Sequence, residues 1–410
     1  MLTVHRNHSA LALLLAAGLS VSSFSIRSVA GPQGTPPSLS RIDGVVRQAI
    51  DNGRIPGAVV LVGQGGRILF EKAFGHRCLE PRLEPMTLET RFDLASLTKV
   101  VVTAPAVLIL VQDGKVRLGD PVSKYLPGFG RSGKETVTVR QVLTHYSGLA
   151  PFFRLKARGH GAASAVIDKI YDSDLSATPG SRFIYSDLGF ILLGKLVEVV
   201  SGEPLDRFVH SRVFSPLKMV ETGFSPSPGD RHHIAPTEKR DDGTFLRGQV
   251  HDPLASTMGG VAGHAGLFSN ARDLSRYCRM LLNEGSLEGA RLLQPRLVRQ
   301  MVSPQSPPDK PDVRGLGWDI QSRYSSAKGA HFSPHSFGHT GFTGTSLWLD
   351  PEVQAYLIVL TSRLHPDGGG DVRALRKEIA TIVGEALSPS TGHDAGDPTA
   401  ASRSRHRPGR

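Results

Sequence analysis

Three short patterns in this sequence place a lysine three residues after a serine, a spacing at which the lysine amine could take the proton of the serine hydroxyl. They are Ser96-Leu-Thr-Lys99, Ser215-Pro-Leu-Lys218 and Ser325-Ser-Ala-Lys328. On a helix, residues three apart share one face, and a serine hydroxyl needs a base because it is a weak nucleophile at neutral pH. Ser325 lies in a Ser/Gly-rich stretch and Ser215 directly precedes proline, whereas Ser96 opens a long apolar stretch. The N-terminus of a helix stabilises negative charge that develops during a reaction, so this context favours Ser96 over the other two serines. The alternative is that Ser96 only caps the helix, which would give the same sequence pattern.

Two further patterns supply the other groups that such a serine needs. Tyr185-Ser-Asp187 is the only Tyr-x-Asn/Asp in the chain, and a tyrosine hydroxyl near the serine and lysine can pass a proton to the leaving group. His339-Thr340-Gly341 is the only Lys/His-Thr-Gly triplet. Its glycine would let substrate approach a strand edge, and the next backbone N–H can donate into an oxyanion hole. The three patterns together predict a serine nucleophile at Ser96.

Signatures of other hydrolases are absent from the sequence. There is no G-x-S-x-G of the α/β-hydrolases, and no H-E-x-x-H or paired-cysteine knuckle that would hold zinc, despite sixteen histidines. His232 and His233 are adjacent in the sequence, and the side chains of adjacent residues rarely bind one metal ion because they point in different directions. We therefore expect these two histidines to lie in a solvated loop. Nothing in the sequence brings Cys78 and Cys278 together, which predicts free thiols. We therefore expect no metal and no other cofactor.

The composition sets the class of protein. Of the 410 residues, 39% are hydrophobic and 21% charged, with 45 glycines and 28 prolines, which excludes a coiled coil, a collagen-like repeat and a wholly disordered chain. The net charge is +11, yet the only basic cluster is Arg403-Ser-Arg405-His-Arg407. The sequence contains no nucleic-acid-binding motif, so we expect no nucleic-acid partner. An anionic wall polymer and a membrane surface suit the charge equally well.

The N-terminus has the pattern of a secretory signal. Arg6 precedes the apolar run Ala10–Val21, and Ser28-Val29-Ala30 precedes Gly31, a pattern that predicts cleavage after Ala30 and a secreted or periplasmic protein. A buried N-terminal helix is the alternative, and the run is short for a membrane span. No transmembrane domain is expected beyond this signal segment. The predicted division is a signal peptide (1–30), a linker (31–40), one folded domain (41–388) and a disordered tail (389–410).

Hydrophobic periodicity predicts the elements that position these residues. The expected elements are helices over 42–52, 96–113 and 372–387, and strands over 58–62, 67–71, 346–350 and 355–360. Pro105 lies inside the second helix and should bend it. Strands near both ends, with helical patterns over 120–310 between them, predict one sheet built from distant segments beside a helical insertion.

The three patterns resemble the S-x-x-K, Y-x-N and K-T-G motifs of the serine β-lactamase and penicillin-binding-protein family, specifically its class C and esterase-like branch. Leu143-Thr-His-Tyr-Ser-Gly-Leu149 is also typical of it, and the resemblance covers about residues 40 to 388. It implies an α/β fold of the α+β type, with an antiparallel sheet flanked by helices and a mostly helical second subdomain. It implies Ser96 as nucleophile, Lys99 and Tyr185 as shared base and acid, and the Ser96 and Phe342 N–H groups as oxyanion hole. Substrate contacts are implied at Asp187, His339, Thr340 and Gly341.

Two residues depart from the family pattern, with Asp187 in place of asparagine and His339 in place of lysine. Both substitutions argue against efficient β-lactamase activity. They favour the esterases, the peptidases and the members of the family that act on the cell wall. An unperturbed imidazole loses its charge near pH ~6.5, and we expect Asp187 across the cleft to extend the charged range of His339 upward. We also expect burial and a cationic neighbour to leave Lys99 neutral for part of the time.

The stretch His251-Asp-Pro-Leu-Ala255, followed by 259–269, resembles a subset of the family linked to cell-wall turnover, some of whose members cleave the amide between N-acetylmuramic acid and L-alanine. Within it, His264 is either a loop residue packed under the site or a substrate contact, and His145 is expected to be structural. We therefore predict an exported serine hydrolase that acts through an acyl-enzyme on amide or ester bonds of peptidoglycan fragments. The alternatives are a β-lactamase, a D-alanyl-D-alanine carboxypeptidase, a small-ester esterase, or a non-catalytic penicillin-recognising protein. The oligomeric state is left open.

Overall fold

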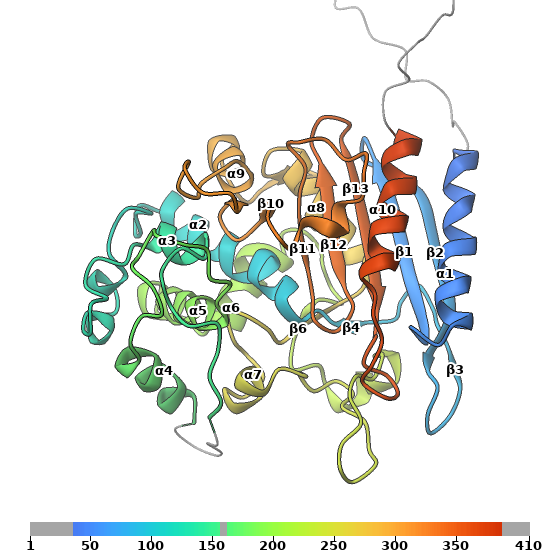
Figure 1. Cartoon of the computed structure of the whole chain (residues 1–410), viewed down its shortest axis with the longest axis horizontal. Helices are drawn as coiled ribbons and strands as arrows, with labels where there is room; N and C mark the ends of the chain where they lie inside the picture. Colours follow the sequence, from blue (N-terminus) through green and yellow to red (C-terminus); the bar gives the residue numbers. More distant parts are fainter. Residues whose placement is uncertain (1–35, 156–161, 388–410) are drawn as a thin grey trace, which may run out of the picture. The chain divides into compact units, whose positions relative to one another are not determined.

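A computed structural model of the protein describes residues 36–155 and 162–387 (Figure 1). The predicted signal segment, the cleavage after Ala30 and the predicted tail from 389 lie outside these residues. The predicted linker lies partly inside them. Its last part, Pro37–Ser40, forms a short 3₁₀ helix with Leu39 buried, because this leucine joins the same apolar cluster as the following helix.

An eight-stranded sheet runs in the order β3-β2-β1-β13-β12-β11-β10-β9, and all of its paired strands are antiparallel. Its strands are β1 (Gly57–Gln64), β2 (Arg67–Cys78), β3 (Glu84–Pro85), β9 (Val313–Arg314), β10 (Asp319–Gln321), β11 (Phe337–Thr340), β12 (Ser346–Asp350) and β13 (Ala355–Thr361). Val60 of β1 lies opposite Val359 of β13. The two ends of the domain therefore meet in the middle of one sheet, which confirms the prediction from the sequence.

The central strands are apolar throughout because both faces of the sheet are covered. Alternate residues of a strand point to opposite faces. Val60 packs with the helices α1 (Arg41–Asp51) and α10 (Arg373–Leu387), which lie side by side in Figure 1. Val59, its neighbour, packs instead into the larger core shared with the helical region.

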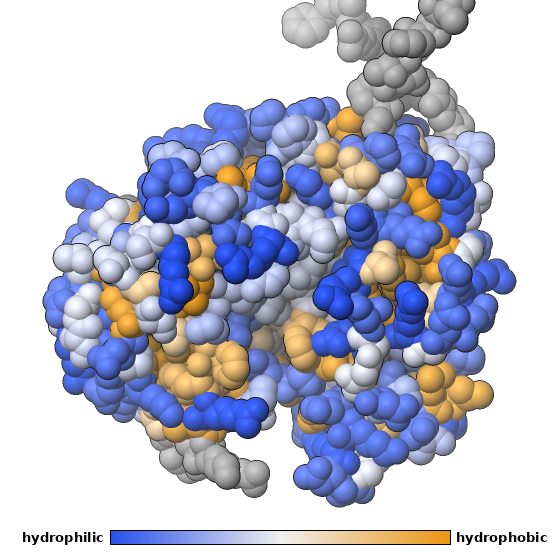
Figure 2. All heavy atoms as spheres, in the orientation of Figure 1, coloured by the Kyte–Doolittle hydropathy of each residue, from blue (hydrophilic) through white to orange (hydrophobic). Residues whose placement is uncertain are grey.

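The second region is mostly helical, as predicted. Its helices are α2 (Ala104–Gln112), α3 (Val139–Leu143), α4 (Ala162–Asp172), α5 (Asp187–Ser201), α6 (Leu205–Val209), α7 (Pro253–Thr257) and α9 (Pro295–Val302). The helix α8 (Ala271–Leu282) packs instead on the central strands β1 and β13 of the sheet. Two further strands, β7 (Ser286–Leu287) and β8 (Ala290–Arg291), form a small hairpin. Hydrophobic side chains on the face drawn in Figure 2 occur in small separate groups among hydrophilic ones.

The stretch 96–113, predicted as one bent helix, has three parts. A 3₁₀ turn (Ala95–Leu97) leads into a π-helical turn (Lys99–Thr103) and then into α2. Pro105 lies in the first turn of α2, where a missing backbone N–H costs least. The stretch 95–112 is apolar and long enough to cross a membrane, but 83% of it is buried inside the protein, as in a core helix.

A small three-stranded sheet connects the two regions. Its order is β4-β6-β5, with β4 at Phe92–Asp93, β6 at Leu267–Ser269 and β5 at Gly223–Phe224. Strand β4 leads directly into the turn that carries Ser96, and β6 ends the glycine-rich stretch 259–269. This sheet therefore brings two segments noted in the sequence to one place. Cys78, which ends β2, and Cys278 in α8 are buried and free, as predicted.

Candidate active site

Ser96 lies on a turn that a buried carboxylate holds in place. Ala95 has a φ of 46°, a left-handed conformation that is uncommon outside glycine. Its N–H donates to Asp93 Oδ1 at 2.8 Å, and the His251 N–H donates to Asp93 Oδ2 at 2.7 Å. Burial raises the pKa of Asp93, against these two hydrogen bonds. Asp93 therefore stabilises the strained turn, a role that the sequence reasoning missed although the residue stands three positions before the serine.

Lys99 is fully buried and contacts three oxygen atoms. Its Nζ lies 2.9 Å from Ser96 Oγ, 3.1 Å from the His264 carbonyl oxygen and 2.8 Å from Asp187 Oδ1. Burial lowers the pKa of Lys99, but the charge of Asp187 and the neighbouring Tyr185 outweigh burial and raise the pKa above its ordinary value. The expectation that burial would leave Lys99 partly neutral is therefore wrong. Its resting form is the ammonium ion.

Tyr185 closes the other side of this cluster. The Lys99 Nζ lies 5.1 Å from the centre of the Tyr185 ring, and the His145 ring lies 4.5 Å from it. Burial raises the pKa of Tyr185, while the charge of Lys99 and a hydrogen bond with Ser96 oppose this rise. Tyr185 is therefore a neutral phenol at pH 7, in contact with the nucleophile.

The turn after β11 is bound to the turn that carries Ser96. Thr343 Oγ1 donates to the Asp93 carbonyl at 2.6 Å, and Thr345 Oγ1 donates to the Leu94 carbonyl at 3.1 Å. A Cβ on Gly341 would lie 2.2 Å from Thr345 Oγ1 and 2.5 Å from the Leu94 oxygen. Gly341 is thus required for the close approach of Thr345 and the Leu94 carbonyl, and because it also lines the cavity over Ser96, its predicted role in admitting substrate stays a prediction.

The same contacts place the proposed oxyanion hole. Phe342 follows Gly341 directly, and its carbonyl accepts a 2.6 Å hydrogen bond from Arg363 Nε, which orients this part of the turn. Ser96 and Phe342 line one cavity, together with Thr340. The roles that the family resemblance implied for the Ser96 and Phe342 N–H groups stay a prediction.

His339 lies in the cavity as a neutral imidazole. Burial, then the charges of Arg314 and Lys99, hold the pKa of His339 well below its usual range. Its Nδ1–H donates to the Thr340 carbonyl at 2.9 Å, which leaves Nε2 as an acceptor. The expected imidazolium is therefore wrong. Asp187 does not extend the charged range of His339, because Asp187 pairs with Lys99 and three cations, Arg314, Lys99 and Arg376, act on the buried ring.

His264 lies beneath the site. Its side chain is buried, and its Nε2 is 2.7 Å from Asp252 Oδ1, while its carbonyl accepts from Lys99. Asp252 also caps α7 by accepting from the Ala255 N–H at 2.8 Å. The Asp252 pKa lies well below its ordinary value, since the His264 interaction outweighs burial. The structure thus supports the packed-loop interpretation of His264 and adds Asp252, which the sequence reasoning did not single out.

His145 has the contacts of a structural residue, as expected. Its Nδ1 accepts from the Ser186 N–H at 3.0 Å, and its ring packs on Tyr185 and Phe190. Burial holds the pKa of His145 well below its usual range, so it stays neutral. It therefore supports the tyrosine ring without adding charge to the site.

The other patterns noted in the sequence lie elsewhere. Ser325 Oγ donates to Asp319 at 2.9 Å, and Lys218 lies 3.8 Å from Glu288, so neither alternative forms a serine–lysine pair. His232 and His233 lie on an exposed 3₁₀ turn, as predicted. Within 36–155 and 162–387, no group of His, Cys, Asp and Glu side chains could hold a metal ion.

The cavity over Ser96 has a volume of about 630 Å³ and is rich in arginine. Its arginines are Arg314, Arg323, Arg363, Arg373 and Arg376, and its acidic side chains are Asp319 and Asp371. The first two and Arg373 form ion pairs with aspartates. Among the described residues, Arg363 and Arg376 have no ion-pair partner.

These two arginines hold the backbone around the oxyanion hole. Arg376 donates to the Gly341 and Thr345 carbonyls, both at 2.8 Å, and Arg363 donates to the Phe342 and Gly370 carbonyls. Burial and the nearby Arg363 charge lower the pKa of Arg376 to about 9. A bound anion would therefore stabilise the charged form of the Arg376 side chain. The sequence reasoning missed both residues, because no local pattern marks them.

Comparison with known proteins agrees with this geometry. The family model described as Beta-lactamase matches residues 42–381. A protein of Salmonella schwarzengrund, provisionally named a D-alanyl-D-alanine carboxypeptidase, is 33% identical over 362 residues, which cover 80% of this chain and 83% of that protein. A Salmonella typhi protein with the same name is equally similar.

Two solved structures share the fold. A penicillin-binding protein homologue from Caulobacter crescentus has a TM-score of 0.71 and 20% identity, over 87% of this chain and 99% of that one. EstCE1, described as a hydrolase with promiscuous acyltransferase activity, has a TM-score of 0.67 and 25% identity, over 84% and 98%. The match over residues 42–381 settles the family: the chain belongs to the β-lactamase family of serine hydrolases.

Proposed function

We propose that this hydrolase forms an acyl-enzyme at Ser96 and acts on peptides that carry a free carboxylate, above all the D-alanyl ends of cell-wall peptides. The observation that carries the proposal is a pair of arginines, Arg363 and Arg376, that have no ion-pair partner within 36–155 and 162–387 and lie in the cavity that also holds Ser96. Guanidinium groups bind carboxylates through charge-assisted hydrogen bonds. The provisional name of the Salmonella relatives supports the same substrate class.

The site's groups fit such a reaction. Ser96 Oγ attacks the scissile carbonyl, and the N–H groups of Ser96 and Phe342 stabilise the oxyanion that forms. Tyr185, a neutral phenol beside Ser96, gives its proton to the leaving amine, and water then hydrolyses the acyl-enzyme. Both arginines bind carbonyls of the turn that carries Phe342. The two guanidinium groups therefore lie next to the proposed oxyanion hole. A substrate whose scissile carbonyl is bound there would place its own carboxylate against them.

The cavity charge changes the substrate preference expected from the sequence. Asp187 in place of asparagine argued against efficient β-lactamase activity, but the Asp187 charge is paired with Lys99 at 2.8 Å and so does not face an anionic substrate alone. The arginines instead favour an anionic group. We therefore expect peptides with a free C-terminal carboxylate to react faster than the same peptides with a C-terminal amide.

The test uses the full chain and a mixture of defined muropeptides, with products read by mass spectrometry. The proposal predicts release of D-alanine from pentapeptide stems, with the amidated pentapeptide on the order of 10-fold or more slower, since a charge-assisted hydrogen bond contributes about 1.5–3 kcal/mol. Release of L-alanine-linked peptide from N-acetylmuramic acid would support the muramyl amide interpretation instead. The Ser96→Ala variant is the control and should release nothing.

Export to the cell wall is part of the proposal and rests on the N-terminal sequence alone. Expression of the full chain in a Gram-negative host, followed by fractionation and N-terminal sequencing, should yield a protein that begins at Gly31 outside the cytoplasm. A protein that keeps Met1 and stays in the cytoplasm would contradict it.

A further inference from the structure

The Asp187 carboxylate lies in contact with the Lys99 amine, close enough to exchange a proton with it. Asp187 is the first residue of α5, where the helix dipole favours a negative charge. Its backbone N–H donates to the Pro151 carbonyl at 2.8 Å, which fixes this end of the helix. A single nitrogen, Lys99 Nζ, thus lies 2.9 Å from the nucleophile oxygen and 2.8 Å from the Asp187 carboxylate.

The resting site leaves Ser96 without a ready base. Lys99 is an ammonium ion and Tyr185 is a neutral phenol, so each already holds the proton that a base would have to accept. The other groups that face this cluster are two neutral histidines, the Arg314 cation and the Asp252 carboxylate, which is occupied by His264. Among the described residues, Asp187 is the one carboxylate in contact with Lys99.

We propose that Asp187 is the terminal acceptor of the Ser96 proton, and that Lys99 passes the proton on. Lys99 gives one proton to Asp187 Oδ1 and takes the hydroxyl proton of Ser96 as Oγ bonds to the acyl carbon. The carbonyl π electrons move to the oxygen in the oxyanion hole. When the intermediate collapses, the bond to the leaving group breaks, the leaving group takes the proton of Tyr185, and the proton on Asp187 returns through Lys99 to restore the phenol. This inference rests on the proposed acyl-enzyme at Ser96.

The relay has a consequence for pH dependence. An ammonium–carboxylate pair and an amine–carboxylic acid pair have the same net charge, so transfer inside the pair exchanges no proton with solvent. Acylation should therefore be nearly independent of pH across the neutral range. In Asp187→Asn the internal acceptor is lost, and Lys99 must lose its proton to water before it can act. Acylation by that variant should rise with pH.

The experiment measures the acylation rate of a neutral chromogenic ester from pH 5.5 to 9.5, which avoids the carboxylate subsite. Asp187→Asn should acylate on the order of 10²-fold more slowly at pH 7, the lower end of the usual effect of a positioned base. Its rate should climb with pH while the parent's stays flat. Asp206→Asn, which changes a carboxylate in the first turn of α6, is the matched control and should behave like the parent.

Each outcome decides the proposal. A parallel pH profile with an unchanged rate would show that Asp187 accepts no proton, and a faster variant at pH 7 would show that Asp187 only restrains Lys99 as ammonium. Asp187→Glu keeps the acid and should recover part of the rate with a flat profile, which separates loss of the acceptor from misfolding. If Ser96→Ala still forms the acyl-enzyme, the proposed function fails and not the relay alone.

Discussion

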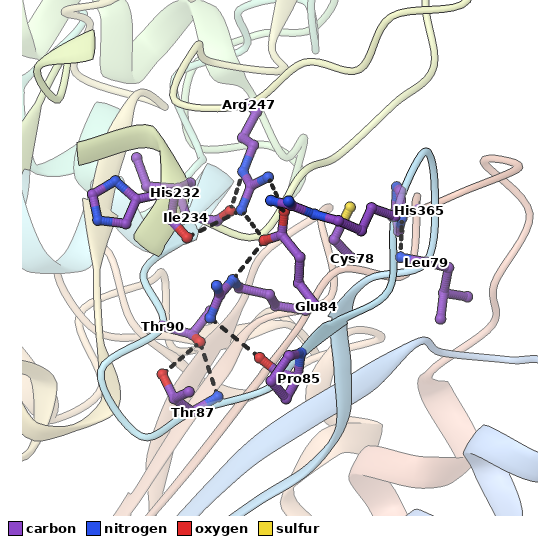
Figure 3. A network of polar contacts seen from close by, with 12 residues as sticks. Cys78, Leu79, Glu84, Pro85, Thr87, Thr90, His232, Ile234, Arg247 and His365 are labelled. Carbon is purple, nitrogen blue, oxygen red and sulfur yellow. Dashed lines mark hydrogen bonds and ion pairs between the residues drawn. The ribbon is translucent and has the colours of Figure 1, made fainter. Parts of the chain in front are cut away.

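Two carboxylates in this protein, the buried Glu84 and the half-buried Asp187, pair with cations and have opposite consequences. Glu84, at the start of β3, accepts from Arg247 Nη1 at 3.0 Å and Nη2 at 2.5 Å and from Arg77 Nε at 2.9 Å (Figure 3). The Arg247 and Arg77 hydrogen bonds lower the pKa of Glu84 to about 2 despite its partial burial. Asp187 pairs instead with Lys99, which also contacts Ser96.

The difference lies in the cation. Arginine keeps its protons in proteins, so the Glu84 pairs are fixed charges that join the β2–β3 turn to the segment around Arg247. Lysine can give up a proton, so the Lys99–Asp187 pair can exchange one with the nucleophile. One cluster therefore stabilises the fold, and the other can take part in chemistry.

Replacing Lys99 by arginine should make its pair with Asp187 resemble the fixed pairs between Glu84 and its arginines. Lys99→Arg keeps the positive charge beside Asp187 but cannot pass on a proton, so we expect acylation to fall by on the order of 10²–10⁴. The larger side chain in a fully buried position should also cost about 1–3 kcal/mol of stability. Acylation kinetics and thermal unfolding measure the two effects separately.

Lys99→Met is the matched control for packing, because it keeps an unbranched chain without the charge. A folded Arg variant that retains more than half of the parent's acylation rate would exclude Lys99 as the residue that handles the proton.

The proposed carboxylate subsite should respond to loss of Arg363, the half-buried member of its two arginines. Arg363→Ala removes one of the two guanidinium groups without ion-pair partners, and we expect it to reduce acylation by a carboxylate-bearing substrate on the order of 10-fold more than acylation by a neutral ester. Arg363 also orients Phe342, so the ratio of the two rates is the measurement. Equal losses for both substrates would mean that Arg363 only positions the turn.

Removing the charge of the structural carboxylate should affect stability and leave the chemistry unchanged. Glu84→Gln should lower the free energy of unfolding at pH 7 by about 1–3 kcal/mol, because two arginines lose their anionic partner. Since folding lowers the pKa of Glu84 from 4.5 to about 2, its contribution is full above about pH 4.5 and is lost as the pH falls through about 2. Denaturant unfolding at pH 7 and at pH 2 should therefore show a difference between parent and variant only at pH 7.

The smallest predicted effect concerns His339. Because burial and neighbouring cations keep this ring neutral, acylation by a carboxylate-bearing substrate should show no step near pH ~6.5, where an unperturbed histidine titrates. His339→Gln, which keeps an acceptor without a titratable ring, should have the same pH profile. A step in the parent that disappears in the variant would show that His339 is charged at acidic pH.

Much of the fold could be predicted, because the signals were local. The apolar runs of β1 and β13 and the periodicity of α1 and α10 identified the sheet and two of its covering helices. Strands near both ends of the domain predicted one sheet built from distant segments, but the direct pairing of β1 with β13 was not predicted, because no local pattern specifies which strands are neighbours. The π-helical turn at Lys99–Thr103 could not be predicted, because a helix with a wider turn has the same apolar pattern as an α-helix.

The sequence predicted which residues form the candidate site, but it did not predict their protonation states. Ser96, Lys99 and Tyr185 stand in short patterns, and the structure brings them together. The protonation of Lys99 and His339 depends on groups more than 80 residues away in the chain, Asp187 for Lys99 and Lys99 for His339. No local pattern marks Arg363 or Arg376, whose proposed role in binding a carboxylate rests on the absence of an ion-pair partner among the described residues.

The most direct test of the central claim is to trap the acyl-enzyme and locate it. The protein is mixed with a slowly hydrolysed carboxylate-bearing ester, quenched in acid and digested, and the peptides are mapped by mass spectrometry. We predict one acyl group per chain on Ser96, and none in the Ser96→Ala variant. An acyl group on another residue, or turnover of the ester by the Ser96→Ala variant at the parent's rate, would contradict the assignment of Ser96 as the nucleophile.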